Sequence, residues 1–437
     1  MQTRVFFHHY GASWTVKVLS GVPGILTTVL LTAVLLTAVS HGQDSFRRTV
    51  TSSEQTRNDE YWQAEAAKIT PDCPHQWWVQ KSVLKGGRQE GVDQIIVNNG
   101  VMEIVLCPTR GMGIIQVSAG TVVLKWDSPV KEIVNPQFVN LNSRGGLGWL
   151  EGFNEFMCRC GLESNGHPGT DRFVNNVGDE AEMELTLHGK IANIPARNVE
   201  VIVDRQAPYA IHIRGQVDEK FLFGPKLELH TELVVIPGET SFQLVDEIRN
   251  VGAQEQEFEI LYHANFGNPL LEEGAEIVAA VKSVMPFNEH AAAGLDAWNV
   301  YAGPTTGFVE QVYLLELKGD DNNHTTALLR NRAASKAATI SWSLDELPYL
   351  TVWKNTGALA DGYVTGIEPG TNYPNNRSVE RQAGRVPKLG PGESHKMTLK
   401  FGLHSGIEAV QAAIDSVRDI SLAGQPIDDP KIEAIKR

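Results

Sequence analysis

The sequence contains few basic residues for its length. Of its 437 residues, 38 are Lys or Arg and 52 are Asp or Glu, which gives a formal net charge of −14 at pH 7. Such an acidic surface repels phosphate groups, so nucleic acids and anionic membranes are excluded as expected partners. A phosphate-binding loop is also missing, because the glycine-rich run at 145–149 is not followed by a helical pattern. We therefore expect no nucleotide cofactor.

Cysteine is scarce, with four residues: Cys73, Cys107, Cys158 and Cys160. In an exported protein they could form disulfides, and three pairings are possible. Cys158 and Cys160 are poor partners for each other because, on a strand, their Cα atoms would lie about 7 Å apart, at the limit for a bridge. They also lack a His or Cys at the spacing of a zinc site. We therefore favour buried free thiols.

A long apolar run occurs near the N-terminus, at about 18–39. Residues 1–17 carry Arg4 and Lys17 and no acid, and Ala38 and Ser40 suit a signal peptidase site. The alternative is an uncleaved anchor, since about 20 apolar residues span a bilayer. We expect residues 1–42 to be a signal peptide or membrane anchor and the rest to be exported, periplasmic or extracellular.

Helical patterns are sparse, whereas alternation of apolar and polar residues dominates from about 92 to 404. Residues 226–233 are one example, and turn signals such as Pro237-Gly238 separate these runs. Alternation indicates strands with one buried face, and many such strands favour an all-β, large antiparallel β-sandwich with few short helices. The expected domain covers 71–405, after a polar linker at 43–70. A C-terminal helix and tail at 406–437 follow from the spacing of Ile407, Val410, Ile414 and Val417.

One carboxylate is placed in a turn-forming setting. Glu368 is followed by Pro369 and Gly370, and it comes after the apolar run 350–353. Because Gly and Pro fix the backbone, we expect a rigid loop here. A Glu held on such a loop is well suited to act as a general base.

Two motifs upstream of Glu368 strengthen its interpretation as a functional residue. One is Leu-His-Gly at 187–189, and the other is Tyr-His followed by Phe-Gly-Asn at 262–268. Their order, with Ile-Glu-Pro near the C-terminus, resembles the aldose 1-epimerase (galactose mutarotase-like) superfamily. Arg-Gly-Met at 110–112 makes the chain most similar to its DUF4432-type branch.

The resemblance implies a galactose mutarotase-like supersandwich and a monosaccharide as partner. The implied reaction interconverts sugar anomers by acid–base ring opening, with no metal or other cofactor. The implied catalytic pair is Glu368 as the base and His263 as the acid. His188 is the implied ligand of sugar hydroxyls. The superfamily's additional Asp has no matching motif here, although Asp296 and Glu310 lie in the corresponding interval.

Three further residues are candidates for substrate binding. Arg110, at a bend between strand-like runs, offers several fixed donors. Asn154 lies in a segment that mixes aromatic, amide and carboxylate side chains, as carbohydrate clefts do. Trp353 is either a core tryptophan or a sugar platform.

Two other functions remain open at this stage. The same sandwich could bind carbohydrate without catalysis, since a fold alone does not determine function. It could also process extracellular glycans as a hydrolase or lyase. A hydrolase needs a second carboxylate, for which Glu151 and Glu163 are candidates.

Overall fold

The computed structural model describes residues 45–423 and 431–432. The predicted signal peptide or anchor lies outside the described residues. Within these two ranges, no helix is both long enough and apolar enough to cross a membrane.

The first of two large sheets has ten strands, and every neighbouring pair in it is antiparallel. Their order across the sheet is β18 (Glu276–Ala279), β21 (His324–Arg330), β22 (Lys336–Ser343), β26 (Ser394–Ser405), β15 (Ser241–Asn250), β14 (Lys226–Val235), β13 (Ile211–Lys220), β12 (Asn198–Asp204), β1 (Ser45–Ser52) and β2 (Arg57–Asn58).

The second sheet has thirteen strands and is antiparallel except where β27 pairs with β19. Their order is β27 (Lys431–Ile432), β19 (Val281–Pro286), β20 (Gln311–Leu317), β23 (Tyr349–Asn355), β24 (Val364–Gly370), β17 (Glu259–Gly267), β9 (Met157–Leu162), β7 (Gly113–Ala119), β6 (Met102–Cys107), β5 (Asp93–Asn98), β4 (Trp78–Val83) and β3 (Tyr61–Glu65), with β8 (Val122–Leu124) beside β7.

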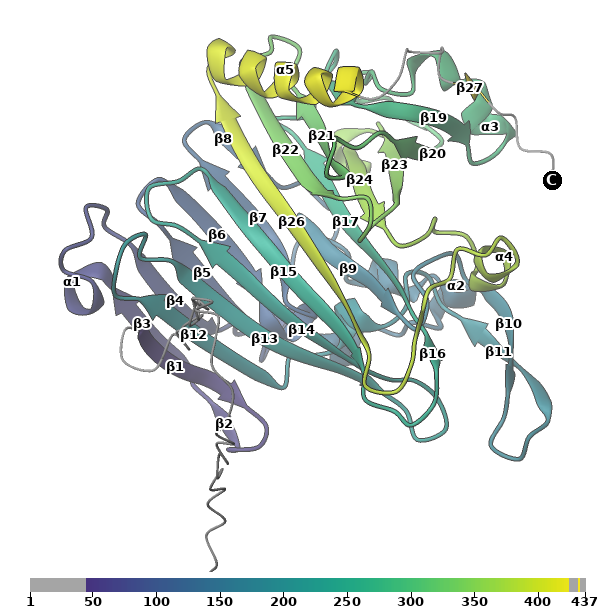
Figure 1. The fold of residues 1–437 in the computed structure, drawn as a ribbon, viewed down its shortest axis with the longest axis horizontal. Helices are drawn as coiled ribbons and strands as arrows, with labels where there is room; N and C mark the ends of the chain where they lie inside the picture. The colour runs from purple at the N-terminus through teal and green to yellow at the C-terminus, as the bar shows by residue number, and fades with distance from the viewer. Residues whose placement is uncertain (1–44, 424–430, 433–437) are drawn as a thin grey trace, which may run out of the picture. The chain divides into compact units, whose positions relative to one another are not determined.

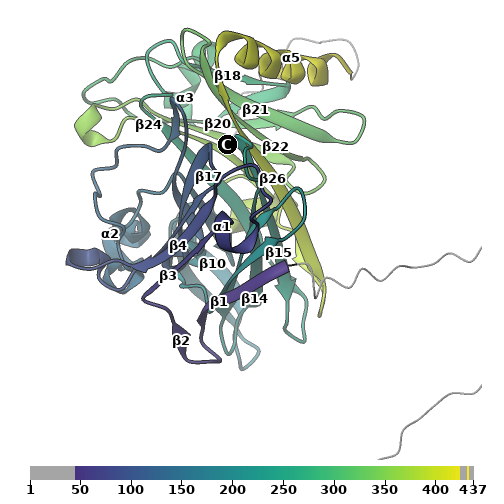
Figure 2. The ribbon, with the colours of Figure 1, turned by 90° about the vertical axis from the view of Figure 1, so that its left-hand side faces the viewer.

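The two sheets form the layers of a sandwich (Figures 1 and 2). Along β14, buried and partly exposed residues alternate strictly, as the sequence pattern predicts. The buried side chains of both sheets join one core cluster, to which Leu229 and Leu233 contribute from one sheet and Ile104 and Val117 from the other. The predicted all-β antiparallel sandwich is thus confirmed.

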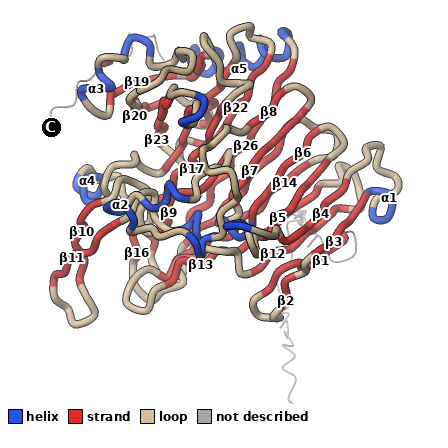
Figure 3. Tube along the Cα trace, turned by 180° about the vertical axis from the view of Figure 1, so that it is seen from behind, coloured by secondary structure: helices blue, strands red, loops and turns tan. Residues whose placement is uncertain are grey.

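Helices are short and lie outside the sheets, as the blue segments of Figure 3 show. The longest, α5 (Ile407–Ala423), follows the predicted spacing, and Val410, Ile414 and Val417 pack against Leu328 and Ala337. The other α-helices are α1 (Ala66–Ile69), α2 (Ser143–Gly146), α3 (Glu289–Ala292) and α4 (Arg377–Gln382). Two small two-stranded sheets are separate from the two large ones: the hairpin of β10 (Gly169–Val174) with β11 (Glu180–Leu185), and the pair of β16 (Gln256–Glu257) with β25 (Lys388–Leu389), which are distant in sequence.

The prediction of a polar linker at 43–70 is wrong for its described part. β1 pairs with β12 over most of its length, and Phe46 stacks on Trp62 with ring centroids 6.3 Å apart. The segment contains few large apolar side chains, but backbone hydrogen bonds to a neighbouring strand do not depend on side-chain polarity. The sandwich therefore includes the described residues from Ser45 onward, and not only those from residue 71.

Candidate functional site

Three adjacent strands of the larger sheet, β9, β17 and β24, are buried along their whole length. One face of these strands packs against the other sheet, to which Tyr262 and Ile367 contribute. The opposite face carries a second, smaller cluster that includes Cys158, Cys160 and Leu261. Because side chains alternate along a strand, His263 shares this second face with Leu261.

Strand register brings the two predicted catalytic residues together. Ala264 pairs with Ile367 across β17 and β24, so His263 and Glu368 occupy facing positions on the same side. His263 Nε2 lies 3.2 Å from Glu368 Oε1, and the two side chains are 5% and 2% exposed.

Glu368 is therefore not on a loop, as its Gly and Pro neighbours predicted, but on β24 in the interior of the sheet. The ladder between β17 and β24 has no paired positions at Glu368 and Pro369. This gap accommodates the missing N–H of the proline. Pro369 still faces Leu350 of β23 on its other side.

Asn265 fixes the tautomer of His263. The Asn265 Nδ2 group donates to the carbonyl oxygens of Glu155 and His263, at 3.0 and 3.1 Å. Its Oδ1 therefore faces His263 Nδ1, 2.7 Å away, and can only accept a hydrogen bond. The proton is held on Nδ1, so in the neutral ring Nε2 presents a lone pair to Glu368.

Aromatic rings surround this pair. The ring centroids of Phe153, Trp353 and Trp149 lie 5.1, 5.5 and 5.9 Å from that of His263. Phe153 and Trp149 are themselves almost fully buried. We refer to His263, Glu368 and these three rings together as the aromatic chamber.

The chamber disfavours charge on both members of the pair. Burial raises the pKa of Glu368 well above its usual value, and the nearby charge of Glu310 raises that pKa further. Burial lowers the pKa of His263 well below its usual value, and His188 lowers it further. A protonated carboxyl beside a neutral imidazole is the favoured state, instead of the carboxylate and imidazolium that the sequence-based assignment requires.

Two buried polar atoms here have no hydrogen-bond partner in the described chain. They are Glu368 Oε1, which is close to His263 but poorly aligned with it, and the indole Nε1 of Trp149. Unpaired buried polar atoms are costly, and in native proteins they concentrate where a ligand or water supplies the partner.

His188 also lies beside the pair. Its ring is 5.2 Å from the ring of His263, at an interplanar angle of 84°, and 4.7 Å from that of Trp149. His188 Nδ1 donates to the carbonyl oxygen of Asn165 at 2.8 Å, which leaves Nε2 as an acceptor. Burial lowers the pKa of His188 to about 4, so it is neutral at pH 7. Its backbone has a φ of 59°.

Trp353 is partly exposed and adjoins the aromatic chamber. Its Nε1 donates to Glu310 Oε2 at 2.8 Å. The sequence placed Glu310 in the interval of the family's additional acid but gave no motif for it. Glu310 comes just before β20, and this position is the sequence signal that could have identified it. β20 pairs with β23 so that Gln311 faces Lys354, which is the residue after Trp353.

The side chains of Arg110 and Asn154 bond to other residues of the chain in this conformation, and their role as substrate ligands stays a prediction. Arg110 is fully buried, its Nε donates to Glu155 Oε1 at 2.9 Å, and its terminal nitrogens bond to Asn193 and to the Gly152 carbonyl. Asn154 Nδ2 donates to the carbonyl oxygens of residues 130 and 132. Both side chains hold the covering segment that carries Trp149 and Phe153.

The two carboxylates considered for a hydrolase have other partners. Glu151 accepts from the Asn140 backbone N–H at 3.4 Å, and Glu163 pairs with Lys190 at 3.3 Å. Neither has a described contact with Glu368. In the described part of the chain, no group of three His, Cys, Asp or Glu residues is arranged to hold a metal ion. All four cysteines are free and buried, as favoured from the sequence.

Comparison with known proteins identifies the family of this chain and its fold. A family model described as a domain of unknown function, DUF4432, matches residues 89–403. A crystal structure of a "putative aldose 1-epimerase" from Klebsiella pneumoniae subsp. pneumoniae is 39% identical, with a TM-score of 0.82 over 90% of this chain and 98% of that one.

A galactose mutarotase-like protein from Clostridium acetobutylicum shares the fold at 14% identity, with a TM-score of 0.50 over 80% of this chain and all of that one. No curated protein matches the chain. On the family match and the Klebsiella structure together, the chain belongs to the DUF4432 family and has a galactose mutarotase-like fold.

Proposed function

We propose that this protein is a cofactor-independent aldose 1-epimerase-like enzyme that interconverts the anomers of a monosaccharide. The single observation that supports this most strongly is the 3.2 Å approach of His263 and Glu368 inside the aromatic chamber. A proton donor and a proton acceptor in mutual reach, shielded from water, are what sugar ring opening requires.

The proton balance of the reaction fits this pair. Ring opening removes one proton from the anomeric hydroxyl and adds one to the ring oxygen, so it needs one acid and one base with no net change. In the state that burial favours, the Glu368 carboxyl is the donor and His263 Nε2 is the acceptor. When that proton moves from the Glu368 carboxyl to His263 Nε2, the roles are exchanged: Glu368 becomes the base and His263 the acid, as the sequence-based assignment has them. The net charge of the chamber does not change.

The remaining groups suit sugar binding. The rings of Phe153, Trp149 and Trp353 offer flat apolar surfaces to the C–H faces of a pyranose. Sugar hydroxyls would supply the missing partners of Glu368 Oε1 and Trp149 Nε1. His188 Nε2 is a further acceptor for a hydroxyl. Because the pair is almost fully buried, entry of a sugar requires displacement of the covering side chains, as in many closed active sites.

The experiment is a measurement of anomer exchange. We expect the wild-type protein to accelerate the approach of pure α-glucose, α-galactose or another free aldose to anomeric equilibrium, followed by polarimetry or exchange NMR. Glu368→Gln and His263→Asn should each lower kcat by about 10²-fold or more, the contribution of a positioned acid or base.

The matched control is Glu103→Gln, on β6 of the same sheet, which should retain wild-type exchange rates. Sugar binding without acceleration would make the protein a non-catalytic carbohydrate-binding protein and would refute the enzymatic proposal. Near-normal activity in both Glu368→Gln and His263→Asn would refute the assignment of the pair.

A further inference from the structure

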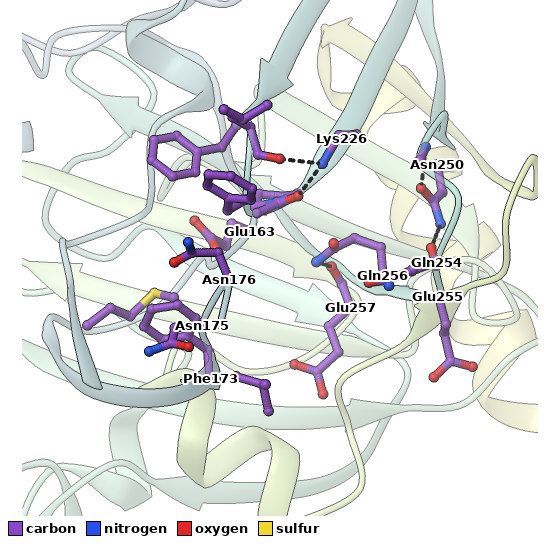
Figure 4. Close-up of a pocket in the computed structure, with 18 of the residues that line it drawn as sticks. Glu163, Phe173, Asn175, Asn176, Lys226, Asn250, Gln254, Glu255, Gln256 and Glu257 are labelled. Atoms are coloured by element: carbon purple, nitrogen blue, oxygen red, sulfur yellow. Dashed lines mark hydrogen bonds between the residues drawn. The ribbon is translucent and has the colours of Figure 1, made fainter. Parts of the chain in front are cut away.

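A large cleft lies outside the aromatic chamber, with a volume of about 1060 Å³. Its walls are the β10–β11 hairpin, the turn between β13 and β14 at 221–225, and the segment 250–257 (Figure 4). In Figure 4, Phe173, Asn175 and Asn176 stand on one side, and Gln254, Glu255, Gln256 and Glu257 on the other.

The turn at 221–225 presents apolar side chains to solvent. Phe221, Leu222 and Phe223 are 66%, 75% and 60% exposed. The turn is nevertheless well fixed, because Lys226 Nζ donates to the carbonyl oxygens of Leu222 and Gly224, both at 3.1 Å. Phe221 N–H also donates to the Pro225 carbonyl at 2.8 Å. A rigid apolar surface loses little conformational entropy when a ligand covers it.

Most charged side chains that line the cleft have an ion-pair partner. Among the described residues, Glu184 and Lys226 have none: Glu184 accepts from the Thr170 hydroxyl, and Lys226 donates to backbone carbonyls of its own turn. Glu163 pairs with Lys190 at 3.3 Å, and Glu257 pairs with Arg381 at 2.7 Å. Arg377, the most deeply buried base in the lining, is bonded to Asp171. An ionic ligand would therefore have to compete with these internal ion pairs.

Uncharged polar groups remain available. The side-chain amides of Asn176 and Gln254 line the cleft and are exposed to solvent. Each amide offers both donors and an acceptor. Exposed aromatic rings beside exposed amides are the combination that holds the C–H faces and the hydroxyls of a neutral sugar.

We propose that this cleft binds a neutral oligosaccharide, at a site separate from the aromatic chamber. Pockets that enclose a drug-sized molecule have volumes of about 300–1,000 Å³, so the cleft accommodates several sugar units rather than one. The proposal goes beyond the proposed function, since it concerns a different ligand at a different place. It holds whether or not the chamber is catalytic.

The test is titration of the whole protein with linear hexasaccharides of glucose, galactose, mannose and xylose, followed by calorimetry and ligand-observed NMR. We expect at least one hexasaccharide to bind at least about tenfold more tightly than its own monosaccharide. The double variant Phe221→Ala/Phe223→Ala should weaken that binding by about tenfold or more, because it removes the two flat apolar surfaces on which a sugar would stack.

The matched control is Tyr61→Ala, which removes another exposed aromatic ring, on β3 and outside the cleft lining. It should leave hexasaccharide binding unchanged, and all three proteins should have the same melting temperature. Any anomer exchange by the wild type should persist in the double variant, which separates this proposal from the catalytic one.

Three results would overturn the proposal: no binding of any hexasaccharide, equal binding by the double variant, or binding only of an acidic oligogalacturonate included for comparison. A concentration-dependent dimer that the double variant abolishes would likewise overturn it, because the exposed turn would then serve self-association.

Discussion

His263 and Glu368 contact each other through Nε2 and Oε1, 3.2 Å apart, from facing positions on two neighbouring strands. No Lys or Arg has an ion pair with Glu368 in the described part of the chain. The carboxyl is thus buried with only a neutral imidazole beside it. In the folded protein, Glu368 is therefore either protonated or carries a buried charge that lowers the free energy of unfolding.

The first prediction concerns stability as a function of pH. Because the pKa of Glu368 is raised on folding, the folded state binds more protons than the unfolded state above about pH 4.5, the ordinary pKa of Glu. The stability that protonated Glu368 contributes is present below that pH, and it is lost as the pH rises toward the pKa that Glu368 has in the folded protein. The Glu368→Gln variant has no carboxyl to ionise and therefore does not lose stability in this way. At pH 8 its free energy of unfolding should exceed that of the wild type by at least about 1 kcal/mol, which corresponds to a shift of one pKa unit.

Urea unfolding from pH 5 to pH 8 measures this effect. The difference between Glu368→Gln and wild type should grow with pH, whereas Glu103→Gln should follow the wild-type curve. A constant difference across this range would show that the carboxyl ionises as freely in the folded protein as in the unfolded chain.

Most of the larger architecture could be predicted because it depends on a local pattern. Alternation along β14 or β15 shows directly which residues face the core, and the helix after Gly406 follows from its apolar spacing. β1 was missed because its sequence, SFRRTVTS, has few apolar residues. β1 pairs with β12 through backbone hydrogen bonds, and this pairing does not require an alternation of apolar and polar residues in the sequence.

The site was predicted only in part. Resemblance to a family identified His263, His188 and Glu368, and their proximity depends on a strand register that no local pattern reveals. Gly and Pro around Glu368 predicted a loop, whereas tertiary pairing with β23 and β17 holds this segment in the sheet. The donors of Arg110 looked available because its partner Glu155 lies far from it in sequence.

The second prediction concerns Asn265 as a positioning residue. Asn265→Ala removes the acceptor that holds the proton on His263 Nδ1. We expect a change in the ¹⁵N NMR signals of this ring that reports loss of the fixed tautomer. Because one hydrogen bond is worth about 1 kcal/mol, any sugar exchange should show a kcat about fivefold lower with little change in KM. Asn322→Ala, in an exposed turn, is the control, and unchanged ring signals in Asn265→Ala would contradict this role.

The third prediction tests the structural role of Arg110. Arg110 and Glu155 are both completely buried and lie 2.9 Å apart. Arg110→Met leaves an uncompensated buried carboxylate and should lower the free energy of unfolding by about 3–5 kcal/mol. The double variant Arg110→Met/Glu155→Gln should recover a large part of this loss, because it removes the unpaired charge. Equal destabilisation of the single and double variants in urea would show that the ion pair does not stabilise the covering segment.

The last prediction concerns the four cysteines. Each is buried, and Cys158 and Cys160 lie on the face of β9 that carries the smaller cluster, opposite His263 and Leu261 of β17. Burial raises the pKa of Cys107 to about 12 and that of Cys160 well above its usual value. Since the thiolate is the reactive form, none of the four thiols should react with a thiol reagent in the native protein.

All four should react after denaturation without any reductant. Mass spectrometry of the unreduced, alkylated chain therefore distinguishes free thiols from disulfides. A disulfide would contradict the packing described for β9 and β6. Rapid labelling of Cys158 or Cys160 in the native protein would instead show that the covering segment opens and exposes these two thiols, beside His263, to solvent.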